Sequence, residues 1–102
     1  MQTILYSDDI NLLSHWKKSL DDNTISLYDL EELNTISNSV VVLNYSSFKA
    51  VCETILKVLT ENNNRILVLD RTPELDTAKK LLKLGVMGYG NAMMRGHFIV
   101  SA

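Results

Sequence analysis

The sequence is poor in several features that mark whole classes of protein. It has one cysteine, Cys52, which excludes a disulfide framework within the chain and a zinc site built from cysteines. Its 10 Lys and Arg residues do not exceed its 12 Asp and Glu residues, so no basic excess favours nucleic acid. No apolar run approaches the ~18 residues of a membrane span, and no positively charged leader is visible. We therefore expect a cytoplasmic protein whose partners are neither membranes nor nucleic acids.

The chain does have enough apolar sequence for one core. Its 102 residues are 46% hydrophobic, and a domain of this length buries roughly two thirds of the surface that its unfolded chain exposes. We predict a single domain over residues 1–102. The last residues include Phe98, Ile99 and Val100, with no polar run after them to end a helix, which suggests a domain cut from a longer chain.

Short apolar segments alternate with amphipathic ones. The apolar segments predict strands, at residues 3–6, 24–28, 40–43, 66–69 and 86–89. Apolar residues at helical spacing between them predict helices over 10–20, 48–59 and 73–84, with at most two helical turns over 30–36. A last helix can start at Met93, although Gly96 interrupts it.

The helix predicted over 73–84 has the clearest boundary signals. Thr72 is a capping residue and Pro73 suits the first helical position, where its missing N–H costs nothing. Gly85 suits the left-handed position that follows a helix. Its expected apolar face consists of Leu75, Ala78, Leu81 and Leu82.

The alternation favours an α/β fold, with a five-stranded parallel sheet covered by helices on both faces. Segments 40–43 and 66–69 are continuously apolar, as in strands buried on both sides. In such sheets ligands bind beyond the carboxyl ends of the strands. The polar and small residues expected there are Asp8, Asp9, Asn44, Asp70, Asn91 and Ala92.

Three segments carry a resemblance to a known family. The order ILYSDD, then VVVLNY, then RILVLDRTPELDTAKKLLKLGVMGYGNA resembles the receiver domain of bacterial two-component response regulators. The resemblance spans nearly the whole chain and is most specific over residues 65–92. It implies a flavodoxin-like (βα)5 fold with strand order 2-1-3-4-5, here with a truncated last helix. It also implies an output domain elsewhere in a longer chain.

The same resemblance assigns roles to individual residues. The family's magnesium-binding acidic pair corresponds to Asp8 and Asp9, and its phosphate-accepting aspartate falls on Asn44. The family's Ser or Thr falls on Asp70, its lysine falls on Ala92, and its switching aromatic residue corresponds to Tyr89. The site therefore resembles that of a pseudo-receiver, which is a receiver domain with a degenerate phosphorylation site.

The three replacements disfavour phosphorylation on chemical grounds. An acyl phosphate needs a carboxylate nucleophile, and the amide of Asn44 is neutral. Ala92 supplies no cation, and Asp70 would add negative charge where a phosphoryl group would sit. No nucleophile–base pair can be assembled from these strand ends, so we do not expect an enzyme.

Two functions follow from this interpretation. The first is a receiver-like signalling domain that acts through protein contacts, with an output domain or a histidine kinase as candidate partners. The alternative is a small-ligand or divalent-cation-binding domain of the same fold. For Mg²⁺ at Asp8 and Asp9 we expect an affinity no better than about millimolar, because so few charged ligands are present.

Structural roles would also account for these residues. Asp8 and Asp9 can cap a helix, Asp70 can cap the turn at Thr72 or pair with Arg71, and Tyr89 can be an ordinary strand aromatic.

The apolar residues near the end of the chain predict self-association, most simply a two-fold dimer through the last helix and the strand beside it.

Overall fold

The computed structural model of the protein describes residues 2–19 and 24–93. Within these residues, five parallel strands form one sheet in the order β2-β1-β3-β4-β5. This confirms the predicted α/β class and strand order. The strands are β1 (Thr3–Tyr6), β2 (Thr24–Leu27), β3 (Val40–Asn44), β4 (Arg65–Asp70) and β5 (Gly88–Asn91).

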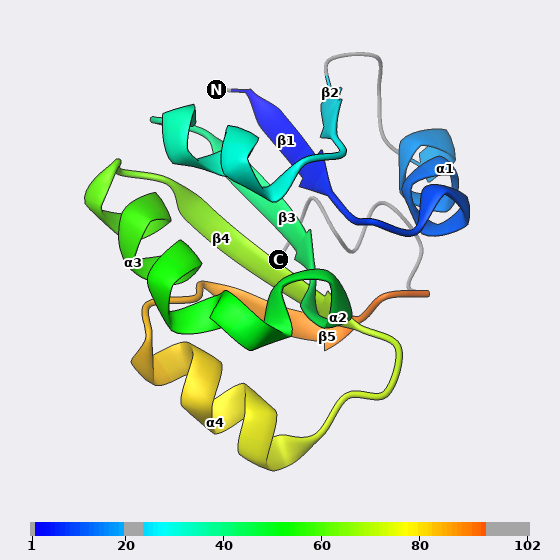
Figure 1. The fold of residues 1–102 in the computed structure, drawn as a ribbon. Helices are drawn as coiled ribbons and strands as arrows, with labels where there is room; N and C mark the ends of the chain where they lie inside the picture. Colours follow the sequence, from blue (N-terminus) through cyan, green and yellow to red (C-terminus); the bar gives the residue numbers. More distant parts are fainter. Residues whose placement is uncertain (1, 20–23, 94–102) are drawn as a thin grey trace.

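Helices cover both faces of the sheet. One side carries α1 (Ile10–Ser19), and the other carries α2 (Tyr45–Phe48), α3 (Cys52–Glu61) and α4 (Leu75–Lys83), as Figure 1 shows. Two 3₁₀ helices complete the described elements, η1 (Leu30–Thr35) and η2 (Lys49–Val51). η1 takes the place of the helical turns predicted over 30–36 and buries Leu33.

Two apolar clusters hold these layers together, because successive strand residues point to opposite faces. The cluster under α1 contains Trp16 and Val42, and both are fully buried. The cluster on the other face contains Val41 and Leu43 from the same strand, together with residues of α2, α3 and α4. Burial on both faces explains the continuously apolar sequence of β3.

The helix predicted over 48–59 is broken into α2, η2 and α3. Phe48 (φ −133°, ψ 7°) and Val51 (φ −125°, ψ 23°) leave the helical region of backbone space. These two breaks rotate the chain so that Tyr45, Phe48 and Cys52 are all buried. A single straight helix was therefore the wrong prediction for this segment.

The start predicted for the fourth helix is also wrong. The N-cap residue of α4 is Glu74, not Thr72. The Thr72 N–H donates to Asp70 Oδ1 over 3.1 Å, so Thr72 lies in a turn before the helix. Glu74 is extended, and its N–H donates to the hydroxyl of Tyr89, so α4 begins at Leu75.

The apolar face of α4 differs from the expected one as well. Leu81 is fully buried, but Leu75 is 71% exposed and Leu82 is 56% exposed. The side that faces the sheet runs through Thr77, Ala78, Leu81 and Leu84 instead. The prediction from leucine spacing therefore placed the buried face of α4 at the wrong angle around the helix axis.

The fifth strand begins two residues later than predicted. The Val86 N–H still donates to the carbonyl of Leu81, as part of the turn that ends α4. Pairing with β4 starts when the Met87 N–H donates to the Ile66 carbonyl over 2.8 Å. The last helix predicted from Met93 and the dimer contact predicted through that helix lie outside the described residues, apart from Met93 itself. In the described part of the chain, no helix is long and apolar enough to span a membrane.

Gly85 is the turn residue that the backbone requires, with a φ of +98°. A Cβ at this position would stand 3.1 Å from Cγ2 of Thr60. Replacing Gly85 by alanine should therefore lower the free energy of unfolding by about 1–2 kcal/mol, measured by urea denaturation. Lys83→Ala, an exposed change in the last turn of α4, should cost under about 0.5 kcal/mol.

Adding Thr60→Ser to Gly85→Ala removes the contacting methyl group. Recovery of part of the lost stability would measure the steric contact, and the remainder would measure backbone strain. Equal stabilities for Gly85→Ala and Lys83→Ala would contradict the prediction.

Candidate functional site

Polar side chains from three neighbouring strands meet at the carboxyl edge of the sheet. Asp8 and Asp9 follow β1, Asn44 ends β3, and Asp70 ends β4. β3 lies directly between β1 and β4. The topology therefore brings these predicted site residues to one edge, with Asn44 in the middle.

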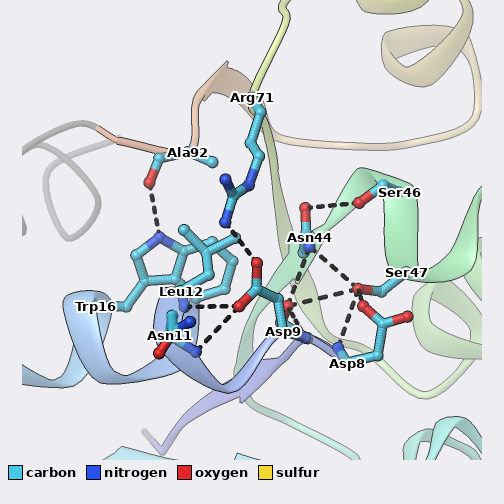
Figure 2. A network of polar contacts seen from close by, with 11 residues as sticks. Asp8, Asp9, Asn11, Leu12, Trp16, Asn44, Ser46, Ser47, Arg71 and Ala92 are labelled. Atoms are coloured by element: carbon cyan, nitrogen blue, oxygen red, sulfur yellow. Dashed lines mark hydrogen bonds and ion pairs between the residues drawn. The ribbon is translucent and has the colours of Figure 1, made fainter.

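The carboxylate of Asp9 is engaged through both oxygens. Oδ1 accepts from the backbone N–H groups of Asn11 (3.0 Å) and Leu12 (3.3 Å), so Asp9 caps α1. Oδ2 accepts from the guanidinium of Arg71, in an ion pair whose side chains are 52% (Arg71) and 33% (Asp9) exposed. Figure 2 shows Arg71 extending from the end of β4 toward Asp9. Such a partly exposed pair contributes about 0.2–1 kcal/mol.

Asn44 is buried within a cluster of hydroxyl groups. It is only 2% exposed, and its Nδ2 donates to Ser7 Oγ (3.0 Å) and to Ser47 Oγ (3.1 Å). Ser46 Oγ lies 3.4 Å from Asn44 Oδ1. The dashed lines in Figure 2 trace this network. The amide of Asn44 is thereby held by hydrogen bonds at both its nitrogen and its oxygen.

Asp8 is joined to the same cluster. Ser47 Oγ donates to Asp8 Oδ1 over 2.6 Å and accepts from the Asp8 backbone N–H over 3.0 Å. Asp8 is exposed, whereas Asn44 beside it is buried. The acidic pair therefore has two separate sets of partners, with Asp9 bound to Arg71 and Asp8 bound to Ser47.

Asp70 and Tyr89 form a second connection, between β4, β5 and α4. The hydroxyl of Tyr89 donates to Asp70 Oδ2 over 2.8 Å and accepts from the Glu74 N–H over 3.0 Å. Asp70 Oδ1 accepts from the Thr72 N–H. Asp70 thus caps the Thr72 turn, one of the structural roles considered, while Arg71 pairs with Asp9 instead.

Ala92, which the resemblance places at the family's lysine position, belongs to the core. It is fully buried, and its N–H donates to the Asp70 carbonyl over 2.9 Å. Its own carbonyl accepts from Trp16 Nε1 over 2.8 Å, which connects α1 to the end of β5. Asn91, the other residue predicted at this strand end, is exposed and accepts from the Met93 N–H.

The carboxylates of Asp8 and Asp9, in their present arrangement, do not form a binding site for a divalent cation. Magnesium and calcium bind sets of oxygen ligands, but Asp9 is already paired with a cation and Asp8 with a hydroxyl group. Across residues 2–19 and 24–93, no three His, Cys, Asp or Glu side chains are grouped to hold a metal ion. That the Mg²⁺ affinity is no better than about millimolar, as expected from the sequence, stays a prediction.

Three residues that complete the network were not predicted from the sequence as parts of the site: Ser7, Ser47 and Arg71. Each stands close after or beside a predicted residue, since Ser7 precedes the acidic pair and Arg71 follows Asp70. Their closeness to a strand end in the sequence could have marked these three residues as candidates for the site. The sequence gives no comparable signal for the direction in which each side chain points.

Comparison with known proteins gives matches in structure only. No protein-family model and no curated protein matches the sequence. A response regulator protein from Burkholderia pseudomallei, solved with a phosphorylated aspartic acid, a calcium ion and citrate, has a TM-score of 0.79 and 13% identity. The match covers 99% of this chain and 65% of that one, so this chain spans less than two thirds of that protein.

A second solved structure is similar over almost its whole length. That protein, described as a CpaE2 pilus assembly protein from Sinorhizobium meliloti, matches with a TM-score of 0.72 and 16% identity, and the match covers 99% of the present chain and 95% of the Sinorhizobium chain. Together with the strand order, these likenesses establish a flavodoxin-like receiver fold. The resemblance to receiver domains is thus confirmed at the level of the fold.

Removing the hydroxyl of Tyr89 should loosen the start of α4. Tyr89→Phe leaves Asp70 Oδ2 and the Glu74 N–H without this partner. We expect a loss of about 1–3 kcal/mol in unfolding free energy, with faster hydrogen exchange of the Glu74 amide. Tyr28→Phe is the matched control, because Tyr28 is 64% exposed. Unchanged exchange at Glu74 would rule out the contact.

The same hydroxyl gives the protein a pH-dependent stability. Burial first, and then the hydrogen bond to Asp70, raises the pKa of Tyr89 above 10.0, against the opposing effect of the Glu74 N–H. Burial and the charges of Asp8 and Asp29 also raise the pKa of Tyr6. Between pH 10 and these folded-state pKa values the folded protein binds more protons than the unfolded one.

Stability should therefore be constant with respect to these two tyrosines below pH 10 and fall as the pH rises above it. Melting temperature measured against pH tests this. Tyr89→Phe should make the decline shallower, and Tyr28→Phe should leave this contribution in place. A decline as steep in Tyr89→Phe as in the unmodified chain would contradict the assignment to Tyr89.

Proposed function

We propose that this chain is a receiver-like signalling domain that works through protein contacts, without aspartyl phosphorylation. The receiver fold supports the signalling class. The finer statement depends on the residue at the end of β3. Asn44 stands where the family's phosphate-accepting aspartate would be, and it is a neutral amide.

The surroundings of Asn44 support the proposal further. Its amide nitrogen donates two hydrogen bonds to serine hydroxyls, and it is 2% exposed. β1 and β4 flank β3, so the Arg71–Asp9 ion pair must cross the carboxyl end of β3. A phosphodonor would thus meet a closed network around a weak nucleophile.

The groups that would sense a phosphoryl group are also replaced. Asp70 carries a carboxylate in place of a hydroxyl, and it already accepts from Tyr89 and Thr72. Ala92 is a buried core residue without a charge. Both changes agree with a domain that is not an enzyme and takes no phosphate.

The proposed partners are proteins, namely an output domain or a histidine kinase, and a second copy of the chain in a two-fold dimer. The cytoplasm is the proposed compartment, on the grounds of composition. The alternative of a cation-binding domain draws support from the calcium ion in the Burkholderia structure. The occupied carboxylates of Asp8 and Asp9 favour the first proposal.

Acetyl phosphate and magnesium test the proposal directly. The protein should keep its unmodified intact mass after incubation, because no carboxylate nucleophile ends β3. A receiver domain with an acceptor aspartate serves as the positive control. A labile adduct of phosphate mass that maps to residues 43–47 would overturn the proposal.

Asn44→Asp separates the nucleophile from the rest of the site. We expect it to be phosphorylated to a small fraction at most, because the lysine and hydroxyl positions are still Ala92 and Asp70. Asn34→Asp is the matched control, an exposed asparagine changed in the same way. Complete modification of Asn44→Asp would show that the acceptor alone had been limiting.

A further inference from the structure

Three carboxylates and the guanidinium group of one arginine, Arg71, lie at the carboxyl edge of the sheet. Asp8, Asp9 and Asp70 come from the ends of β1 and β4. Arg71 forms a salt bridge with Asp9 at this edge. Ala92 supplies no positive charge here. Within the described residues, Arg71 is the cation shown in an ion pair with one of these carboxylates.

Arg71 also occupies the oxygen that a metal ion would need. Asp9 Oδ1 is used by two backbone N–H groups of α1, which leaves Oδ2 as the available ligand, and Oδ2 is bound by the guanidinium. A dication at this oxygen would lie within a few ångströms of a positive charge. Like charges at such a distance repel strongly, so metal and Arg71 cannot share Asp9 Oδ2.

We propose that Arg71 is the built-in cation of this site, which takes the place of a divalent metal ion beside the acidic pair and makes the edge metal-independent. The guanidinium has a fixed charge at all accessible pH values and donates through a planar fork. It also ties the end of β4 to the start of α1, which a freely exchanging ion would do only when bound. The inference does not depend on the absence of phosphorylation.

The experiment is a titration with Mn²⁺ alone, followed by paramagnetic broadening of backbone amide signals, and repeated with Mg²⁺ by chemical shift. The unmodified chain should show no site-specific broadening at Asp8 and Asp9 below about millimolar metal. In Arg71→Gln the same amides should respond, with an affinity at least about tenfold higher, because the competing charge is gone. Arg71 is half exposed, so this variant should fold.

Two matched variants make the result specific. Arg65→Gln removes an exposed arginine from the opposite end of the same strand and should bind metal no better than the unmodified chain. Adding Asp9→Asn to Arg71→Gln should abolish the gained affinity. Equal affinities in the unmodified chain and Arg71→Gln, whether measurable or not, overturn the proposal. No phosphodonor is present, so this outcome is independent of the phosphorylation test.

Discussion

The central constraint on this structure is that a parallel sheet collects the carboxylates of distant segments at one edge. Asp8, Asp9 and Asp70 would repel one another there unless each had a compensating donor. The chain supplies three different ones: the Ser47 hydroxyl for Asp8, the Arg71 guanidinium for Asp9 and the Tyr89 hydroxyl for Asp70. Each donor lies on a different element from its acceptor, so balancing the charge also joins the loops. The same contacts that stabilise the edge therefore determine its shape.

Much of the fold could be predicted from sequence, because burial on both faces leaves an unmistakable pattern. Val40 to Leu43 and Ile66 to Leu69 are continuously apolar since helices cover both sides of β3 and β4. Prediction failed where a tertiary contact decided the local structure. The N–H of Glu74 bonds to Tyr89, 15 residues away, so α4 starts after Pro73 rather than at it. Leu75 and Leu82 had helical spacing but are exposed, whereas Leu81 and Leu84 pack against the sheet.

The candidate site divides in the same way. Which residues end each strand follows from where the apolar runs stop, so the sequence itself places Asn44, Asp70 and Ala92 at the sheet edge. Their partners depend on side-chain direction, which sequence does not encode locally. Arg71 follows Asp70 directly, yet it reaches across β3 to Asp9, because successive residues at a strand end point to different sides.

The network of hydrogen bonds and the ion pair at this edge affect how the domain can signal. A domain that switches needs two conformations within a few kcal/mol of each other. Here the hydrogen bonds of Asn44, the ion pair of Arg71 and the hydroxyl of Tyr89 all favour one conformation. Each hydrogen bond of Asn44 contributes about 0.5–1.5 kcal/mol, the ion pair about 0.2–1 kcal/mol, and loss of the Tyr89 hydroxyl costs about 1–3 kcal/mol. Opening all of them together costs several kcal/mol, so we expect partners to recognise a single fixed surface. NMR relaxation dispersion should then find no microsecond-to-millisecond exchange at Tyr89 or Glu74. Exchange at both residues in the unmodified chain would show that the edge still switches.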